Sequence, residues 1–321
     1  MTKLVNDQRI EKGRRKLAEN GKLLNEIGQK YGINPRFLVA FWGLETDFGR
    51  LAEGYFPTVA ALATLAHDGR RGAFFREQLF AALKIIDQGH ITPERMKGSW
   101  AGAMGHFQFI PTTFAAYAQD YDGDGKRDIW GNQADAYASA ANFLTQSGWN
   151  DSETWGREVK LPKGFDFNLV GMSVKKPLAD WQALGLRRTD GRDLPVADLQ
   201  ASVVAPAGAA GPAFLVYGNF RTIMVWNRSI YYALAVGNLA DRLLGKPAFT
   251  TLGPENSRGL SFAEGKELQR LLTAQGFDTG GVDGVVGPKS REAIRNFQRQ
   301  AGLTPDGHPS VELLQAVRNG L

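Results

Sequence analysis

The sequence predicts a mainly α (α+β) protein: a helical domain with a small β-containing insertion, followed by a three-helix C-terminal module. Helical patterns punctuated by glycines extend to about Trp149. From Gly156 to Phe214 prolines separate short apolar runs such as Ala201–Ala205, which is typical of loops and short strands. The last part of the chain repeats amphipathic helices that end at a glycine and precede an Asp-Gly turn.

The domain boundaries follow from these changes of pattern. Residues 3–30 predict one exposed amphipathic helix. Gly245–Lys246–Pro247 is a helix stop, and the residues after it carry Gly, Pro, Asn and Ser without periodicity, which is typical of a linker. We expect a first domain over residues 1–247 with its insertion at about 156–215, a linker over 248–260, and a C-terminal domain over 261–321.

Composition excludes several classes of protein. The chain has 321 residues, 43% hydrophobic and 22% charged, which is ordinary globular usage and suggests two domains. It has no cysteine, which excludes a disulfide framework, a thiolate metal site and a cysteine nucleophile. No apolar run of about 18 residues occurs, so no membrane span is predicted. The net charge of +5 favours acidic partners, but the basic residues are scattered, so we predict no nucleic-acid partner.

One glutamate occupies a position suited to general acid catalysis. Asn34 is a good N-cap and Pro35 fits the first helical turn, so a helix is predicted through RFLVAFWGLETDF to Gly49. On this helix Glu45 follows Trp42 on one line, beside an aromatic stripe. Burial among aromatics and the carbonyl end of the helix both disfavour the charged carboxylate. A carboxylic acid that stays protonated near neutral pH is what a general acid requires.

A second motif, G-S-W-A-G-A-M-G-H-F-Q-F-I-P over residues 98–111, is rich in small residues that allow backbone to approach a ligand closely. Ser99 and Gln108 can hydrogen-bond hydroxyl and acetamido groups, while Phe107 and Phe109 offer flat apolar surface for sugar rings. His106 lies in the motif without cysteine or histidine partners at ligand spacing, so zinc is not predicted. No phosphate-binding glycine loop precedes a helix, and we expect no organic cofactor.

An acidic segment predicts a structural Ca²⁺ site. Alternating aspartates followed by Gly125 match the start of an EF-hand loop, but Gly131 stands at the twelfth position, where that loop has glutamate. Asp135, on the following helix, can supply the missing carboxylate through a longer loop. The predicted ligands are the side chains of Asp120, Asp122, Asp124 and Asp135, the carbonyl of Lys126 and, through water, Asp128. The alternative is an acidic surface turn without metal.

Together these motifs resemble the family of membrane-bound lytic transglycosylase B, a lysozyme-like group of peptidoglycan-cleaving enzymes. The resemblance covers about residues 30 to 245. It includes W-G-L-E-T-x-x-G around Glu45, the motif over 98–111, G-D-G at 123–125, A-N-F-L at 141–144, and Trp226–Asn227 followed by Tyr231–Tyr232. It implies a lysozyme-like helical catalytic domain in which Glu45 is the single catalytic acid and base.

The resemblance also implies a set of substrate-binding residues. Arg70 and Arg71 are placed beside the cleft, where they meet acidic peptide stems, although solvated surface charge is the alternative. Phe143 and Trp226 stand where relatives often have tyrosine. The residues placed along the glycan cleft are Ser99, Gln108, Phe109, Phe143, Trp226, Asn227 and Tyr232.

The C-terminal module resembles the peptidoglycan-binding domain of many cell-wall hydrolases over about residues 260 to 317. The matching positions are Leu268–Gln269, Gly276–Phe277, Val282–Asp283–Gly284, Gly287–Pro288, Ala293–Ile294, Phe297–Gln298, Gly302–Leu303 and Asp306–Gly307. The resemblance implies that the module binds the wall polymer, and a generic helical bundle is the alternative.

A single acid suits a reaction that needs no water. Ordinary glycosidases use two carboxylates, but Asp47 would point away from Glu45 on the same helix, and the other acids lie outside the motifs. The resemblance implies cleavage of the β-1,4 bond between N-acetylmuramic acid and N-acetylglucosamine, with formation of a 1,6-anhydro ring. A hydrolytic muramidase and a non-catalytic wall-binding scaffold are the alternatives.

The substrate sets the expected partners and location. The partners are peptidoglycan glycan strands and peptide stems, with other cell-wall enzymes as candidates. The first residues lack the apolar region of a signal peptide, and the substrate lies outside the cytoplasmic membrane, so we expect an export signal to have been removed. Without a lipid-acceptor cysteine, a soluble periplasmic form is expected.

Overall fold

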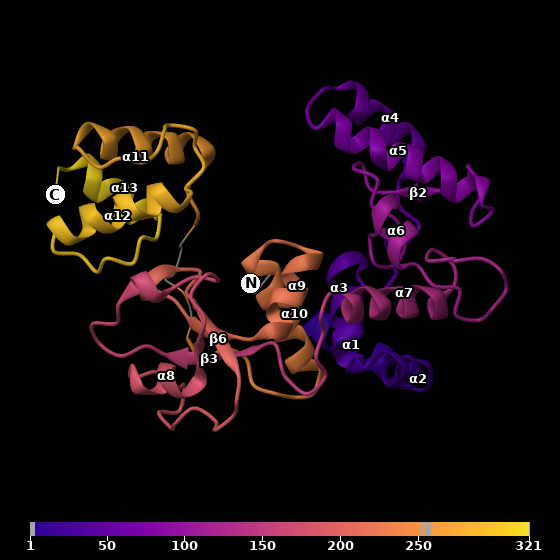
Figure 1. Ribbon diagram of the computed structural model, residues 1–321, viewed down its shortest axis with the longest axis horizontal. Helices are drawn as coiled ribbons and strands as arrows, with labels where there is room; N and C mark the ends of the chain where they lie inside the picture. Colours follow the sequence, from indigo (N-terminus) through magenta and orange to yellow (C-terminus); the bar gives the residue numbers. More distant parts are fainter. Residues whose placement is uncertain (1–3, 252, 254–257, 321) are drawn as a thin grey trace. The chain divides into compact units, whose positions relative to one another are not determined.

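The computed structural model describes residues 4–251, 253 and 258–320, and the chain divides into two compact units. The first unit comprises Met1–Trp155 and Gly218–Ala248, and the second comprises Gly156–Tyr217 and Phe249–Leu321. Figure 1 draws their helices and strands and labels the α-helices and some of the strands. Among the described residues, no helix has both the length and the apolar character needed to cross a bilayer.

The first unit is helical, apart from one short strand pair, as the sequence predicts. Its elements are α1 (Asp7–Glu19), α2 (Gly21–Tyr31), α3 (Pro35–Thr46), β1 (Phe56–Pro57), α4 (Thr58–His67), α5 (Gly72–Asp87), β2 (Lys97–Gly98), α6 (Pro111–Tyr117), α7 (Gln133–Gln146), α9 (Gly218–Trp226) and α10 (Ile230–Leu243). The prediction of one helix over residues 3–30 is wrong. The chain breaks between α1 and α2 at Asn20, whose side-chain amide donates to the carbonyl of Lys16 at 3.0 Å.

Helix α3 is the central helix of this unit and packs against α1, α2, α7 and α10. It begins as predicted, since the Asn34 side chain accepts from the Arg36 backbone N–H at 3.3 Å and a proline occupies the first turn. Its predicted end is wrong, because the helix stops at Thr46. The next two residues, Asp47 and Phe48, have left-handed backbone conformations with φ of 52° and 57°.

Tertiary packing accounts for this early end. A Cβ on Gly43 would lie 2.6 Å from the Phe48 ring, and one on Gly13 would lie 3.1 Å from it. The two glycines therefore leave room for the ring, which is 5% exposed. A left-handed conformation costs a non-glycine residue about 1–2 kcal/mol, and burial of this ring offsets that cost.

The second unit contains the predicted β insertion, a five-stranded sheet with strand order β4-β6-β7-β3-β5 in which every neighbouring pair is antiparallel. Its core includes Trp181, Val203 and Leu215, which are fully buried. The elements are β3 (Gly156–Lys160), η1 (Phe167–Leu169), β4 (Lys176–Pro177), α8 (Leu178–Ala183), β5 (Arg187–Arg188), β6 (Gln200–Val204), η2 (Gly208–Ala210) and β7 (Ala213–Val216).

The same unit contains the three predicted C-terminal helices, α11 (Phe262–Ala274), α12 (Pro288–Gln300) and α13 (Val311–Arg318). A repeated device fixes the two Asp-Gly turns. The buried Gln269 donates to Asp283 at 2.9 Å and accepts from the Gly284 N–H at 2.7 Å. The corresponding distances from Gln298 to Asp306 and Gly307 are 2.7 and 2.8 Å. These bonds explain physically the internal repeat seen in the sequence.

The linker predicted over 248–260 lies partly outside the described residues. Within the second unit, the Ala209 N–H, which belongs to the insertion, donates to the Asp306 carboxylate of the C-terminal helices at 2.8 Å. The compact units therefore group the insertion with these helices, whereas the sequence boundaries group it with the first domain.

Candidate active site

The carboxyl group of Glu45 receives two hydrogen bonds on the same oxygen. The Trp226 indole N–H donates to Oε1 at 3.0 Å, and the Tyr232 hydroxyl donates to the same atom in a short hydrogen bond. Trp226 is the last residue of α9, and Tyr232 lies in the first turn of α10. Two hydrogen-bond donors from the last two helices of the first unit therefore meet a carboxyl group on its third helix.

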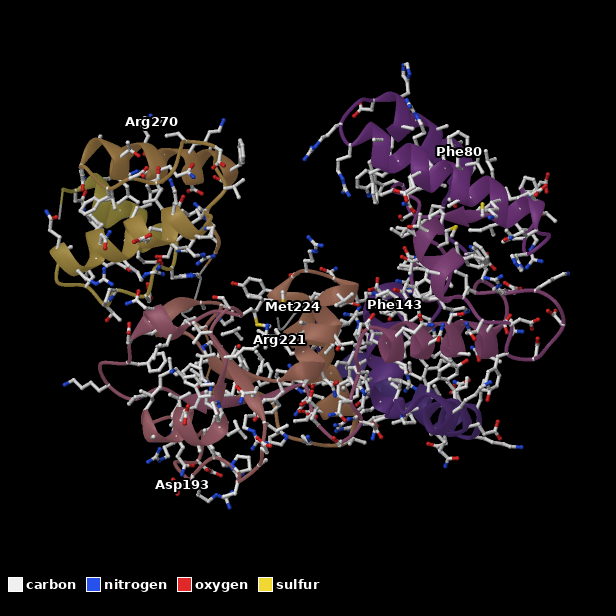
Figure 2. The ribbon with its side chains drawn as sticks, in the orientation of Figure 1. Phe80, Phe143, Asp193, Arg221, Met224 and Arg270 are labelled. Carbon is white, nitrogen blue, oxygen red and sulfur yellow. The ribbon has the colours of Figure 1, made fainter. Side chains whose placement is uncertain are left out.

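Aromatic rings surround the indole that contacts Glu45. The ring centroid of Trp226 lies 4.6 Å from that of Phe41, 4.8 Å from that of Phe143 and 5.4 Å from that of Phe109. Phe143, labelled in Figure 2, belongs to α7. These rings fix the indole plane and leave its N–H directed at Oε1.

The apolar surroundings change the acidity of both partners. Burial raises the pKa of Glu45 from 4.5 to about 7, against the lowering effect of the bonds from Tyr232 and Trp226. Burial, followed by the negative charge of Glu45, raises the pKa of Tyr232 well above its usual value. The phenol therefore stays protonated as a donor, and the carboxyl group can exchange a proton near neutral pH.

His106 holds the end of the helix that carries Glu45. The Trp42 indole N–H donates to Nδ1 of His106 at 2.8 Å, and the Thr46 hydroxyl donates to the His106 carbonyl at 2.8 Å. The His106 ring also hydrogen-bonds to the backbone of Trp130, and burial lowers the pKa of His106. The imidazole is thus neutral at neutral pH and accepts at Nδ1, which fixes the last turn of α3 on both sides of Glu45.

The residues of the 98–111 motif have structural roles that the sequence did not indicate. The Ser99 hydroxyl oxygen accepts from the backbone N–H groups of Ala101 at 3.3 Å and Ala103 at 3.1 Å. Gln108 has a left-handed φ of 52°, and its side chain donates to the Gly105 carbonyl at 3.0 Å. Both side chains are half-buried.

Phe109 and Phe107, the rings expected to stack on sugars, are largely buried. Both are 3% exposed, because their rings pack against Trp226 at 5.4 and 6.1 Å. Phe143 is 7% exposed and packs on Tyr117 at 4.7 Å as well as on Trp226. These phenylalanines support the indole beside Glu45 instead of presenting a free face.

The remaining predicted substrate residues lie on the surface. Asn227 is exposed, and its side-chain oxygen accepts from the Ser229 N–H at 3.1 Å, which shapes the turn before Tyr232. Arg70 and Arg71 are exposed at the start of α5, and the Arg71 guanidinium lies 4.1 Å from the Phe74 ring centroid.

The acidic loop gathers three of the predicted ligands. Asp120, Asp122 and Asp135 each offer a carboxylate oxygen within 4.8 Å of the others. Asp135 is fully buried and accepts from the Tyr121 and Asp128 N–H groups at 2.7 and 2.8 Å. Burial raises the pKa of Asp135, and the charges of Asp122 and Asp120 raise it further.

The other predicted ligands lie outside this group of three. Asp124 accepts from the Lys126 N–H at 2.8 Å, and Asp128 accepts from the Trp130 and Gly131 N–H groups at 3.0 and 2.8 Å. These bonds shape the loop locally.

Comparison with known proteins gives two family matches. Residues 1–241 match the family described as the transglycosylase SLT domain, and residues 263–317 match the family of the peptidoglycan binding domain. The crystal structure of SltB3 from Pseudomonas aeruginosa in complex with NAG-anhNAM-pentapeptide is 45% identical with a TM-score of 0.96, and the match covers 99% of this chain and 85% of that chain.

Two relatives from Escherichia coli are more distant. Membrane-bound lytic murein transglycosylase B is 32% identical over 231 residues, which are 68% of this chain and 59% of that protein. The chain thus spans about three fifths of that relative's length. The structure of the lytic transglycosylase Slt35 in complex with calcium is 30% identical with a TM-score of 0.67, covering 76% of each chain.

Proposed function

Because the chain belongs to the transglycosylase SLT domain family, we propose that it cleaves the β-1,4 bond between N-acetylmuramic acid and N-acetylglucosamine in peptidoglycan without consuming water. The observation that carries this proposal is Glu45, a carboxyl group with a pKa of about 7 whose Oε1 accepts from Trp226 and Tyr232. This geometry supports one residue that acts first as acid and then as base.

The two carboxylate oxygens have different roles in the proposed reaction. An indole N–H can only donate, so Oε1 is committed as an acceptor and the acidic proton resides on Oε2. Oε2 gives its proton to the bridging oxygen as the muramic C1–O bond breaks. Trp226 and Tyr232 stabilise the ionised Glu45 by hydrogen bonds. The Glu45 carboxylate then takes the proton of the muramic C6 hydroxyl, while the oxygen of that hydroxyl bonds to C1. The proton count balances, and the product is a 1,6-anhydro ring.

The surroundings of Asp47 also favour this reaction over hydrolysis with two carboxylates. Asp47 is two residues from Glu45, but its carboxylate bonds to Lys12 Nζ at 3.1 Å and Arg50 Nε at 2.7 Å. These partners hold the pKa of Asp47 below its usual value. An engaged carboxylate of this kind is poorly suited to activate water.

The experiment for this proposal compares the parent with Glu45→Gln, using Glu153→Gln as a control. Glu153 is a half-buried carboxylate whose pKa burial also raises, but it accepts from the Asn219 N–H at 2.9 Å, away from Glu45. Release of soluble fragments from purified wall should fall at least about 10²-fold in Glu45→Gln and stay near the parent level in the control. Activity of Glu45→Gln within about tenfold of the parent would contradict the assignment.

The acidic loop is proposed to hold a structural Ca²⁺ through Asp120, Asp122 and Asp135. Hard carboxylate oxygens are the ligands that Ca²⁺ prefers, and a cation bound between these three would relieve their mutual repulsion. We propose Asp124 and the Lys126 carbonyl as further ligands, and Asp128 as a ligand that acts through water. The ion would stabilise the loop that runs between α6 and α7.

The C-terminal helices are proposed to hold the enzyme on its polymeric substrate. The match of residues 263–317 to the peptidoglycan binding domain supports this role. With a wall substrate, we propose a periplasmic location, glycan strands and peptide stems as partners, and other cell-wall enzymes as candidate partners. Tethering to the polymer raises the local concentration of cleavable bonds.

A further inference from the structure

An ion pair joins the far ends of the two helices that meet at Glu45. Arg36, in the first turn of α3, lies 3.3 Å from Asp241, in the last turn of α10, measured from Nη1 to Oδ1. The two side chains are 12% and 17% exposed. At their other ends the same helices supply Glu45 and Tyr232, whose hydroxyl donates to Oε1. The two helices are therefore antiparallel and connected at both ends.

The two connections have the same spacing on both helices. Nine positions separate Arg36 from Glu45 on α3, and nine separate Tyr232 from Asp241 on α10. At about 1.5 Å of rise per residue, the connections lie about 13 Å apart along the helix pair. Together they fix the register of the helices, because a shift of one helix along the other would stretch both.

The helix contact between the two connections is closely packed. Leu234 and Leu239 on α10 are fully buried, and a Cβ on Gly43 of α3 would lie 3.4 Å from the Leu239 side chain. Close-packed interiors have low compressibility and transmit strain. A displacement of α10 at Asp241 is therefore passed along the helix to Tyr232.

The Asp241 carboxylate is held in one orientation. Its Oδ2 accepts from the Trp155 indole N–H at 3.1 Å. The Trp155 ring lies directly on α10, because a Cβ on Gly237 would be 2.3 Å from it. This bond leaves Oδ1 to two cations, Arg36 from α3 and the Lys246 ammonium, which is 2.8 Å away.

The Arg36 guanidinium depends on this carboxylate. In the described part of the chain its Nε is buried without a hydrogen-bond partner, so the charge is compensated by Asp241. A buried ion pair adds little to stability, since a well-packed apolar pair is often at least as stable. The pair is better explained by the geometry that it imposes on the two helices.

We propose that Arg36 and Asp241 are positioning residues that set the hydrogen bond from Tyr232 to Glu45. The pair fixes the register of α10 on α3, and this register places the phenol on Oε1. The proposal rests on the proposed function, because that hydrogen bond stabilises the ionised carboxylate during the reaction. A displacement of about 1 Å at such a site can cost about 10²-fold in rate.

The experiment compares Arg36→Met with Lys246→Met. Both cations contact Oδ1 of Asp241, and methionine keeps an apolar stem, but Lys246 follows the end of α10 and its pair reaches no second helix. The pKa of Glu45 is measured in the free protein from its side-chain carboxyl ¹³C resonance, which Glu45→Gln identifies. Arg36→Met should weaken the bond from Tyr232 and raise this pKa by about half to one unit, whereas Lys246→Met should leave it in place.

Turnover and a second variant extend the test. On a soluble glycan, Arg36→Met should lower kcat about tenfold and leave KM near the parent value. Asp241→Asn keeps an acceptor for Trp155 but removes the charge, so it should shift the pKa in the same direction even where Arg36→Met does not fold. In Tyr232→Phe, which lacks the donor, adding Arg36→Met should cause no further shift.

Three results would overturn the inference. The first is an unchanged pKa of Glu45 in Arg36→Met and Asp241→Asn with a lowered melting temperature, because the pair would then be merely structural. The others are an equal shift in Lys246→Met and a further shift in the Tyr232→Phe background. If the parent released no anhydro fragments, the proposed function would fail instead. The resonance needs no turnover, so the two failures are distinguishable.

Discussion

Replacing Tyr232 with phenylalanine tests how the carboxyl group of Glu45 is tuned. The variant removes one of the two donors on Oε1 and keeps the ring that packs near Phe41 at 6.2 Å. A hydrogen bond to a charged group contributes about 1.5–3 kcal/mol, and one pKa unit corresponds to about 1.4 kcal/mol. The pKa of Glu45, about 7 in the parent, should therefore rise by about one to two units.

The assay is the pH dependence of kcat/KM on a soluble glycan. Glu45 must be protonated to act as acid, so activity falls as pH rises through its pKa. In the pH profile of kcat/KM, the fall on the alkaline side (the alkaline limb) should lie about one to two pH units higher for Tyr232→Phe than for the parent. Tyr231→Phe is the control, since Tyr231 is 51% exposed and adjacent in sequence, and its limb should not move. An alkaline limb of Tyr232→Phe that stays in place or moves to lower pH would refute the reasoning.

Three further predictions concern stability. Folding raises the pKa of Glu45 from 4.5 to about 7, so the protonated carboxyl group stabilises the parent at low pH and this contribution is lost as pH rises through that window. Between pH 5 and pH 8 the free energy of unfolding of Glu45→Gln should therefore rise relative to that of the parent by up to about 3 kcal/mol. A difference in melting temperature that stays constant with pH would contradict this. Trp42→Phe leaves His106 Nδ1 unpaired and should lower both melting temperature and kcat, whereas Trp181→Phe, which removes a comparable 3.0 Å bond to Ala201, should lower only stability. Chelator should lower the melting temperature and Ca²⁺ should restore it in the parent but not in Asp135→Asn; no response in the parent would make the loop a plain acidic turn.

Local signals in the sequence predicted local features of the fold correctly. Asn34 and Pro35 mark the start of α3, and the prolines after Gly156 mark the insertion that forms the sheet. Gly276 and Gly302 follow directly after the caps of α11 and α12, and an Asp-Gly turn follows each before the next helix. Each of these depends on residues close together in the chain, where caps and turns leave a readable pattern.

Features that depend on distant residues could not be predicted in the same way. The end of α3 is set by the Phe48 ring against Gly13, and the bond from Trp226 to Glu45 joins residues 181 positions apart. The burial of Phe109 depends on that same indole, so a ring expected to contact sugar packs inside. Trp100 lies in the motif but its exposure follows only from the folded turn.

The most direct test of non-hydrolytic cleavage by Glu45 is mass spectrometry of fragments released from purified wall in ¹⁸O-labelled water. The parent should release disaccharide-peptides that are one water lighter than hydrolytic fragments and carry no label at the new muramic end. Glu45→Gln should release neither form. Incorporation of ¹⁸O at that end by the parent would contradict the account, because it would show that water, and not the C6 hydroxyl, attacks the sugar.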